Sequence, residues 1–172
     1  MQFLGLFLSL NFTFSAQTGD QPNIIYLMMD EWGYFESGHM GHKELITPNI
    51  DRFATEGMRF RNAMAGAPVC GPTRCTLLTG LHSGHTSMRN NNGFAPIRKD
   101  EPTLASMLKK QGYATGGFGK WGIGGRGTSG VPEKHGFDHF FGYYDQVHAH
   151  TFYPQYLIHN SAEVPLEGNP GT

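Results

Sequence analysis

The sequence has little cysteine: only Cys70 and Cys75 occur among 172 residues. A fold that depends on a disulfide scaffold carries more cysteines than this, so that class of small protein is excluded. The two cysteines lie in a stretch that we expect to be helical, where side chains five positions apart are offset around the axis. A disulfide between them is therefore not expected.

The chain also lacks an excess of charge of either sign. Lys and Arg number 13 and Asp and Glu 14, for a formal net charge of -1 with histidines neutral. A nucleic-acid-binding domain usually has a clear basic excess, so no nucleic acid is expected as a partner. With 38% hydrophobic and 16% charged residues, the composition is that of a globular domain.

No hydrophobic run is long enough to predict a stable membrane span. The apolar stretch at 1–16 is too short to cross a bilayer comfortably and is followed by polar residues. It is typical of a secretory signal peptide cleaved near Ala16, which predicts export to a periplasmic, extracellular or secretory compartment. Because its start has no Lys or Arg, a membrane-tethering segment is the alternative.

The remaining chain alternates between strand and helix patterns. Residues 23–29 form a continuous apolar run that ends at Asp30 and Glu31, which is typical of a strand buried on both faces. Pro48 and Gly57 bound a short amphipathic helix. Further expected elements are a strand at 58–63, helices at 73–81 and 102–111, a strand at 113–118, and long loops after residue 124. This alternation predicts an α/β fold with a mostly parallel sheet.

One stretch, at 70–80, reads Cys-Gly-Pro-Thr-Arg-Cys-Thr-Leu-Leu-Thr-Gly. Pro72 can open a helix, which places Cys70 just before the first turn, beside unpaired N–H groups and the positive end of the helix dipole. Arg74 lies about one turn further on and adds a fixed cation. A nucleophile beside an oxyanion-binding helix end is a coherent catalytic layout. Cys75, inside the helix, is interpreted as core packing.

This stretch resembles the signature of the type I, formylglycine-dependent sulfatases, C-x-P-[ST]-R-x-x-L-L-T-G, at every fixed position. The resemblance implies that a formylglycine-generating enzyme oxidises Cys70 to formylglycine. Its hydrated aldehyde would attack sulfur, displace the alcohol and then expel sulfate, while Arg74 steadies the gem-diol. The alternative is an ordinary buried cysteine at a helix start.

The pair Asp30-Glu31 corresponds to an Asp-Asp pair with which sulfatases hold a divalent cation, usually calcium and less often magnesium. Calcium takes several oxygen ligands in flexible geometry, which suits a carboxylate pair. The resemblance implies Asp30 and the formylglycine from Cys70 as ligands. Glu31 is one methylene longer than the family's second Asp, and either ligates with adjusted geometry or lies behind the ligands. The family's other ligands, an Asp-Asn pair, are expected beyond this chain.

A later G-K-W-G stretch resembles the family's G-K-W-H-L-G motif. It would carry Lys120 to the end of a strand, where the ammonium contacts the sulfate and the formylglycine. Gly122 stands where the family has a histidine that donates a proton. Some sulfatases pair G-K-W-G with an A-H-x-[FY]-Y-P stretch, which makes His150 the first candidate for that proton donor and His148 the second. A loop histidine without a role is the alternative.

From residue 22 to 172, the resemblance implies the N-terminal part of a sulfatase catalytic domain. The implied fold is alkaline-phosphatase-like, a mostly parallel sheet flanked by helices and incomplete in this chain. The implied function is hydrolysis of a carbohydrate or aryl sulfate. Two alternatives stay open: a phosphonate or phosphodiester hydrolase with the same motif and fold, and a truncated, non-catalytic binder of sulfated glycans. We expect weak or no turnover from the isolated chain.

Overall fold

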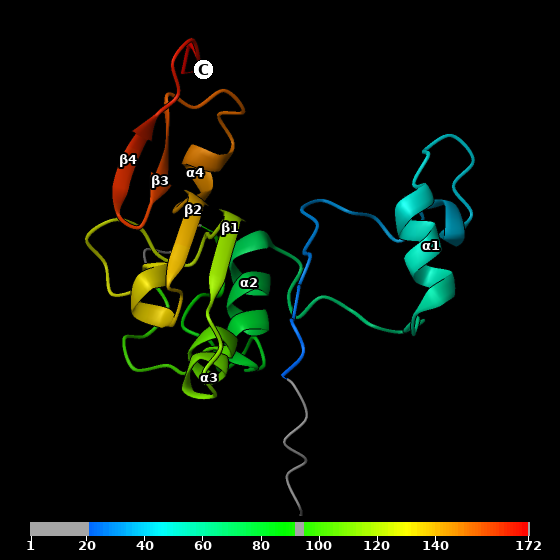
Figure 1. Cartoon of the computed structure of the whole chain (residues 1–172), viewed down its shortest axis with the longest axis horizontal. Helices are drawn as coiled ribbons and strands as arrows, with labels where there is room; N and C mark the ends of the chain where they lie inside the picture. Colours follow the sequence, from blue (N-terminus) through cyan, green and yellow to red (C-terminus); the bar gives the residue numbers. More distant parts are fainter. Residues whose placement is uncertain (1–20, 92–94, 172) are drawn as a thin grey trace, which may run out of the picture.

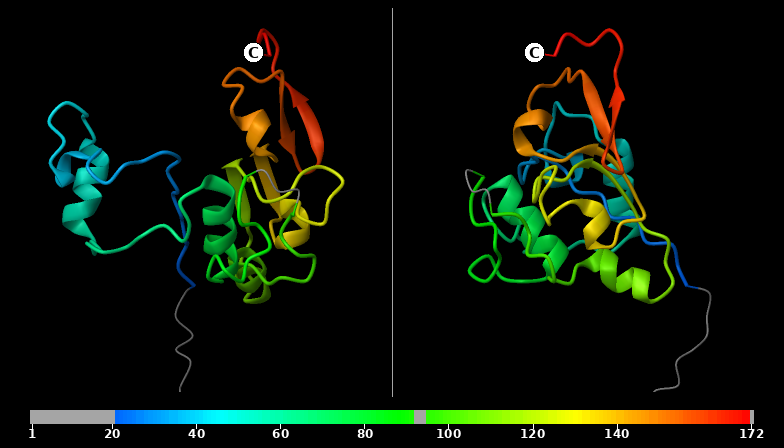
Figure 2. Two further views of the ribbon diagram at one scale, coloured as in Figure 1. Left: turned by 180° about the vertical axis from the view of Figure 1, so that it is seen from behind. Right: turned by 90° about the vertical axis from the view of Figure 1, so that its left-hand side faces the viewer.

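The computed structural model describes residues 21–91 and 95–171, so the expected signal peptide at 1–16 lies outside the described residues. One sheet contains the strands β1 (Gly116–Lys120), β2 (His139–Tyr143), β3 (Tyr156–His159) and β4 (Ala162–Pro165), in that order. The helices are α1 (Pro48–Glu56), α2 (Cys70–Thr79), α3 (Leu104–Lys110) and α4 (Gln146–Ala149), with 3-10 turns at Gly38–Met40 and Pro132–His135. Figure 1 shows α2 and α3 beside the sheet and α1 apart from it, and Figure 2 shows the same separation from behind.

The sheet is mixed rather than mostly parallel in the part that the structure describes. β1 and β2 are parallel over their whole length, whereas β2–β3 and β3–β4 are antiparallel. A long crossover joins β1 to β2 and permits parallel pairing. By contrast, Asn160 and Ser161 link β3 to β4 with φ of 44° and 71°. Two positive φ values in a two-residue loop are typical of a tight hairpin, which forces antiparallel strands.

Three of the four strands lie after residue 124, so the expectation of long loops there is wrong. These strands are only four or five residues long, and none of them is a continuous Val/Ile run. Their pairing with β1 and with one another, more than their own composition, makes them strands.

The expected strands at 23–29 and 58–63 are also wrong, because neither segment joins the sheet. Ile25 is 84% exposed and Leu27 is 75% exposed. A strand buried on both faces needs neighbouring strands and covering layers. Within residues 21–91 and 95–171 the apolar run at 23–29 has neither, so most of its side chains are exposed to solvent.

The three expected helices are confirmed, with bounds shifted by a few residues. α1 begins at Pro48 and is followed by Gly57, as predicted, but buries none of its residues. α2 begins at Cys70, three residues earlier than expected, and ends before Gly80, which adopts φ of 68°. α3 begins after Thr103, whose side chain accepts a hydrogen bond from the Ser106 amide in a capping box. None of the helices in the described part of the chain has the length and apolarity to cross a bilayer.

The core lies between the sheet and α2. Cys75 is fully buried there, which confirms its packing role, and burial raises the pKa of its thiol, so the thiolate is disfavoured. The core cluster consists of Cys75, Met88, Ile97, Trp121, Ile123, Val131, Phe140, Tyr144 and Ile158.

Asp138 joins α3 to the start of both parallel strands. Its carboxylate pairs with Lys109 and accepts hydrogen bonds from the amide and hydroxyl of Thr115, each at 2.9 Å. The Lys109 ammonium and then the two Thr115 donors lower the pKa of Asp138 from 3.8 to about 2. These contacts favour the charged carboxylate in the folded state.

Because the folded pKa of Asp138 is lowered, its contribution to stability is present above pH 3.8 and is lost as the pH falls towards 2. We expect urea unfolding of the parent chain to show this loss of stability between those two values. In Asp138→Asn, unfolding should lack that component while the rest of the acid profile is unchanged. Identical acid profiles for the two proteins would contradict the assignment.

Candidate active site

The start of α2 positions Cys70. This residue is the first of the helix, is partly exposed and carries a free thiol. The next amide, that of Gly71, donates to Oδ1 of Asn91 at 2.9 Å. A Cβ at residue 71 would lie 2.5 Å from the sulfur of Met88 and 3.2 Å from the carbonyl oxygen of Gly122. A side chain at the motif's variable second position would therefore force Met88 to move, a constraint that the motif itself does not reveal.

Three chain segments meet at an ion cluster beside this helix. Asp30 Oδ1 lies 3.1 Å from Nη2 of Arg74, and Oδ2 lies 3.0 Å from Nζ of Lys120. Nη1 of Arg74 donates to the carbonyl oxygen of Lys120 as well. The side chains of Arg74 and Lys120 are only 11% and 10% exposed, against 42% for Asp30. The structure thus brings together Asp30, Arg74 and Lys120, which are far apart in the sequence.

The two cations decide the charge of Asp30. Burial acts to raise the pKa of this carboxyl, but hydrogen bonds from Lys120 and Arg74 and their positive charges outweigh it and hold the pKa below 3.8. Asp30 is therefore a carboxylate near neutral pH. The cluster holds one anion between two fixed cations, an arrangement that also suits a sulfate oxygen.

The two histidine candidates have different surroundings. Nε2 of His150 lies 3.1 Å from Nζ of Lys120, at the ion cluster. The ring of His148 instead packs between Tyr143 and Tyr156, with ring centroids 5.2 and 4.4 Å away. His150 is exposed and next to a cationic amine, so it is the histidine that the structure brings to the site.

Glu31 is not brought into the cluster. It is exposed, with φ of 56°, and no hydrogen bond or ion pair to its side chain occurs among the described residues. Over residues 21–91 and 95–171, no three His, Cys, Asp or Glu side chains gather closely enough to hold a metal. Calcium takes six to eight oxygen ligands. The described residues therefore do not make a calcium site by themselves.

Gln146 is a site residue that sequence reasoning missed. It is the first residue of α4, and its Nε2 donates to the carbonyl oxygen of Gly122 at 3.1 Å. Gly122 has φ of +74°, a conformation that favours glycine. Nothing in the sequence signals this contact, because the pairing of β1 with β2 brings Gly122, which follows β1, close to Gln146, which follows β2.

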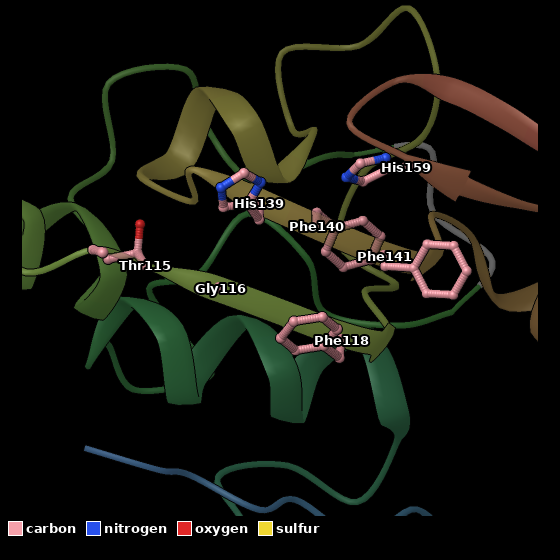
Figure 3. Close-up of a pocket in the computed structure, with 8 residues that line it drawn as sticks. Thr115, Gly116, Phe118, His139, Phe140, Phe141 and His159 are labelled. Carbon is pink, nitrogen blue, oxygen red and sulfur yellow. The ribbon is translucent and has the colours of Figure 1, made fainter. Parts of the chain in front are cut away.

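A separate hollow of about 380 Å³ lies on one face of the sheet, between β1, β2 and β3 (Figure 3). None of the residues predicted as catalytic or metal-binding lines it. Its lining is mostly apolar and aromatic, and consists of Ala114, Thr115, Gly116, Phe118, His139, Phe140, Phe141 and His159.

Comparison with known proteins places this geometry in context. Residues 22–163 match the model of the family described as Sulfatase. Arylsulfatase D of Homo sapiens is 39% identical over 136 residues, which are 71% of this chain and 23% of that protein. Steryl-sulfatase of Rattus norvegicus is 38% identical over 154 residues, 81% of this chain and 27% of that protein. The chain spans about a quarter of the length of these curated relatives.

A solved structure of a protein in complex with its substrate, D-glucosamine-2-N,6-O-disulfate, has the same fold over much of the chain. Its TM-score is 0.71 and its sequence identity 30%, over 86% of this chain and 28% of that one. The predicted α/β class is thereby confirmed, with this chain covering part of the larger fold.

Proposed function

The chain belongs to the sulfatase family, and we propose that it supplies the nucleophile half of an active site that hydrolyses the sulfate ester of a carbohydrate or aryl alcohol. One observation carries the proposal: the complete cysteine motif begins α2, and its arginine is joined to both Asp30 and Lys120. The carbohydrate class is supported by the similar solved protein whose substrate is a disulfated glucosamine.

Formylglycine made from Cys70 would supply a hydrated aldehyde that attacks sulfur and later releases sulfate. The site suits that modification, because Cys70 is partly exposed and its thiol is free. Arg74 and Lys120 would bind the sulfate oxygens as charge develops on them. His150, beside Lys120, would take the place of the family histidine as the proton donor to the gem-diol.

We include a calcium ion in the proposal, with magnesium less expected. Asp30 would ligate it, with Glu31 nearby and the formylglycine from Cys70 as a further ligand. The described residues do not complete such a site, so the other oxygen ligands would have to come from elsewhere. Residues 1–16 are proposed to direct export, which the N-terminal sequence of protein recovered from a secretory host would test.

The decisive test is mass spectrometry of the peptide that carries Cys70, from chain co-expressed with a formylglycine-generating enzyme. We expect conversion of CH₂–SH to CHO at Cys70 and an unmodified thiol at Cys75, which serves as an internal control. The Cys70→Ala chain controls for other losses of mass. An unmodified Cys70, with a known sulfatase converted in the same cells, would contradict the proposal and favour a non-catalytic binder of sulfated glycans.

Turnover then separates sulfatase from phosphodiesterase. We expect the isolated chain to show weak or no hydrolysis, since it spans about a quarter of its relatives. Any hydrolysis by converted chain should be faster on an aryl sulfate than on the matching aryl phosphodiester. The reverse order of rates would support the phosphonate or phosphodiester reading.

A further inference from the structure

Gln146 has no role in the function proposed above, yet its amide group lies inside the candidate active site. Nε2 donates to the carbonyl oxygen of Gly122 at 3.1 Å. Gly122 lies two residues after Lys120, at the point where the chain leaves β1. This hydrogen bond therefore ties the start of α4 to the turn that presents Lys120.

The amide of Gln146 also fills the space that a side chain on residue 122 would occupy. A Cβ built at Gly122 would lie 2.2 Å from Nε2 of Gln146, 3.0 Å from its Cδ, and 3.4 Å from Cδ of Arg74. Real Cβ contacts are essentially never below 3.0 Å. A side chain at position 122 would therefore force the amide of Gln146 to move away from the Gly122 carbonyl, and Arg74 borders the same space.

Packing alone does not account for an amide at this position. Oε1 of Gln146 and Nε of Arg74 are both buried and have no hydrogen-bond partner in the part of the chain that the structure describes. Burying an unpaired amide oxygen is unfavourable, and a methionine would fill similar space without that penalty. Exchanging the amide oxygen and nitrogen would set Oε1 against the Gly122 carbonyl oxygen, so the contact itself orients the amide.

We propose that Gln146 is a positioning residue of the site. By holding the Gly122 carbonyl, it keeps the turn in the conformation in which the Lys120 carbonyl accepts its hydrogen bond from Arg74. It takes the place of a side chain at position 122. A role of Gln146 in catalysis rests on the proposed function, whereas its contacts with Gly122 are independent of that function.

A pair of glycines allows a controlled test of the shared space. Gly119 has φ of +93° with nothing within 4 Å of its Cβ position, whereas Gly122 has φ of +74° and meets Gln146. We expect Gly119→Ala to lower the melting temperature equally in the parent and in Gln146→Ala. Gly122→Ala should lower it by about 3 °C more in the parent than in Gln146→Ala. Equal effects of Gly122→Ala in both backgrounds would overturn the proposal.

Gln146→Met separates positioning from packing. Met fills the space and removes the unpaired Oε1, but it leaves the Gly122 carbonyl without its donor; because these two effects oppose each other, we expect little change in the melting temperature. Hydrogen exchange of the Arg74 guanidinium, followed by NMR, should become about tenfold faster. Unchanged exchange would overturn the proposal, and Gln146→Ala provides the same measurement should Gln146→Met not fold. Neither readout requires modification of Cys70 or turnover, so failure of the proposed function would be seen separately.

Discussion

Truncation of Trp121 to alanine is expected to lower the free energy of unfolding by about 3–5 kcal/mol. The indole is 4% exposed, and its Nε1 donates to the carbonyl oxygen of Gly130 at 2.6 Å. Its ring packs edge-on against Phe137 and Phe140, with centroids 5.5 and 6.1 Å away. Alanine would leave both a cavity and an unpaired carbonyl, and the loss is measured by urea unfolding followed by circular dichroism.

Phe118 provides the matched control, because it is an aromatic residue of β1 that is 79% exposed. Phe118→Ala should change the free energy of unfolding by no more than about 0.5 kcal/mol. Because Trp121 directly follows Lys120, loss of its indole should also make the position of Lys120 in the ion cluster less fixed. A cost for Trp121→Ala below about 1 kcal/mol would mean that the core is not organised around this indole.

The second large effect is expected from Asp30→Ala. Removing this carboxylate leaves Arg74 and Lys120, two cations nearly withdrawn from water, without their shared anion. A fully buried charge left unpaired costs about 3–5 kcal/mol. Because Asp30 is 42% exposed, water screens the pair and we expect about 1–2 kcal/mol. Urea unfolding at low ionic strength measures this loss.

Inorganic sulfate should partly restore the stability of Asp30→Ala, because the anion takes the place of the carboxylate between the two cations. We therefore expect sulfate to raise the melting temperature of Asp30→Ala more than that of the parent. Glu163→Ala is the control, since it removes the carboxylate of an exposed ion pair with Arg126. An equal response to sulfate in all three proteins would show only its general effect on folding, and no anion site at Arg74 and Lys120.

Much of the candidate site could be predicted from local sequence. The end of α2 follows from Gly80, whose positive φ the structure confirms, whereas the helix begins at Cys70, two residues before Pro72. The motif around Cys70 consists of neighbouring residues in one helix, so its recognition does not depend on how distant segments of the chain pair. The roles proposed for Cys70 and His150 stay predictions, although the structure places His150 beside Lys120.

Pairing between distant segments could not be predicted in this way. The apolar run at 23–29 has the composition of a buried strand, yet no described strand pairs with it. β2 and β3 were missed because they are only five and four residues long, too short to show a clear alternation, although their Phe, Tyr and Ile favour strands. Strand formation depends on partners far along the chain, whereas helix formation depends on residues three or four positions away.

By itself, therefore, the sequence determined α1, α2 and α3, the α/β class and the identities of Cys70, Arg74 and Lys120 as site candidates, but not α4. Only the tertiary structure decided that Asp30 pairs with both cations while Glu31 remains in solvent. Only the tertiary structure revealed that Gln146 donates a hydrogen bond to the carbonyl oxygen of Gly122. The reason is physical: composition and periodicity reflect interactions between residues that are close in sequence. Ion pairs and close packing join residues that are far apart in sequence, and they depend on how the fold brings those segments together.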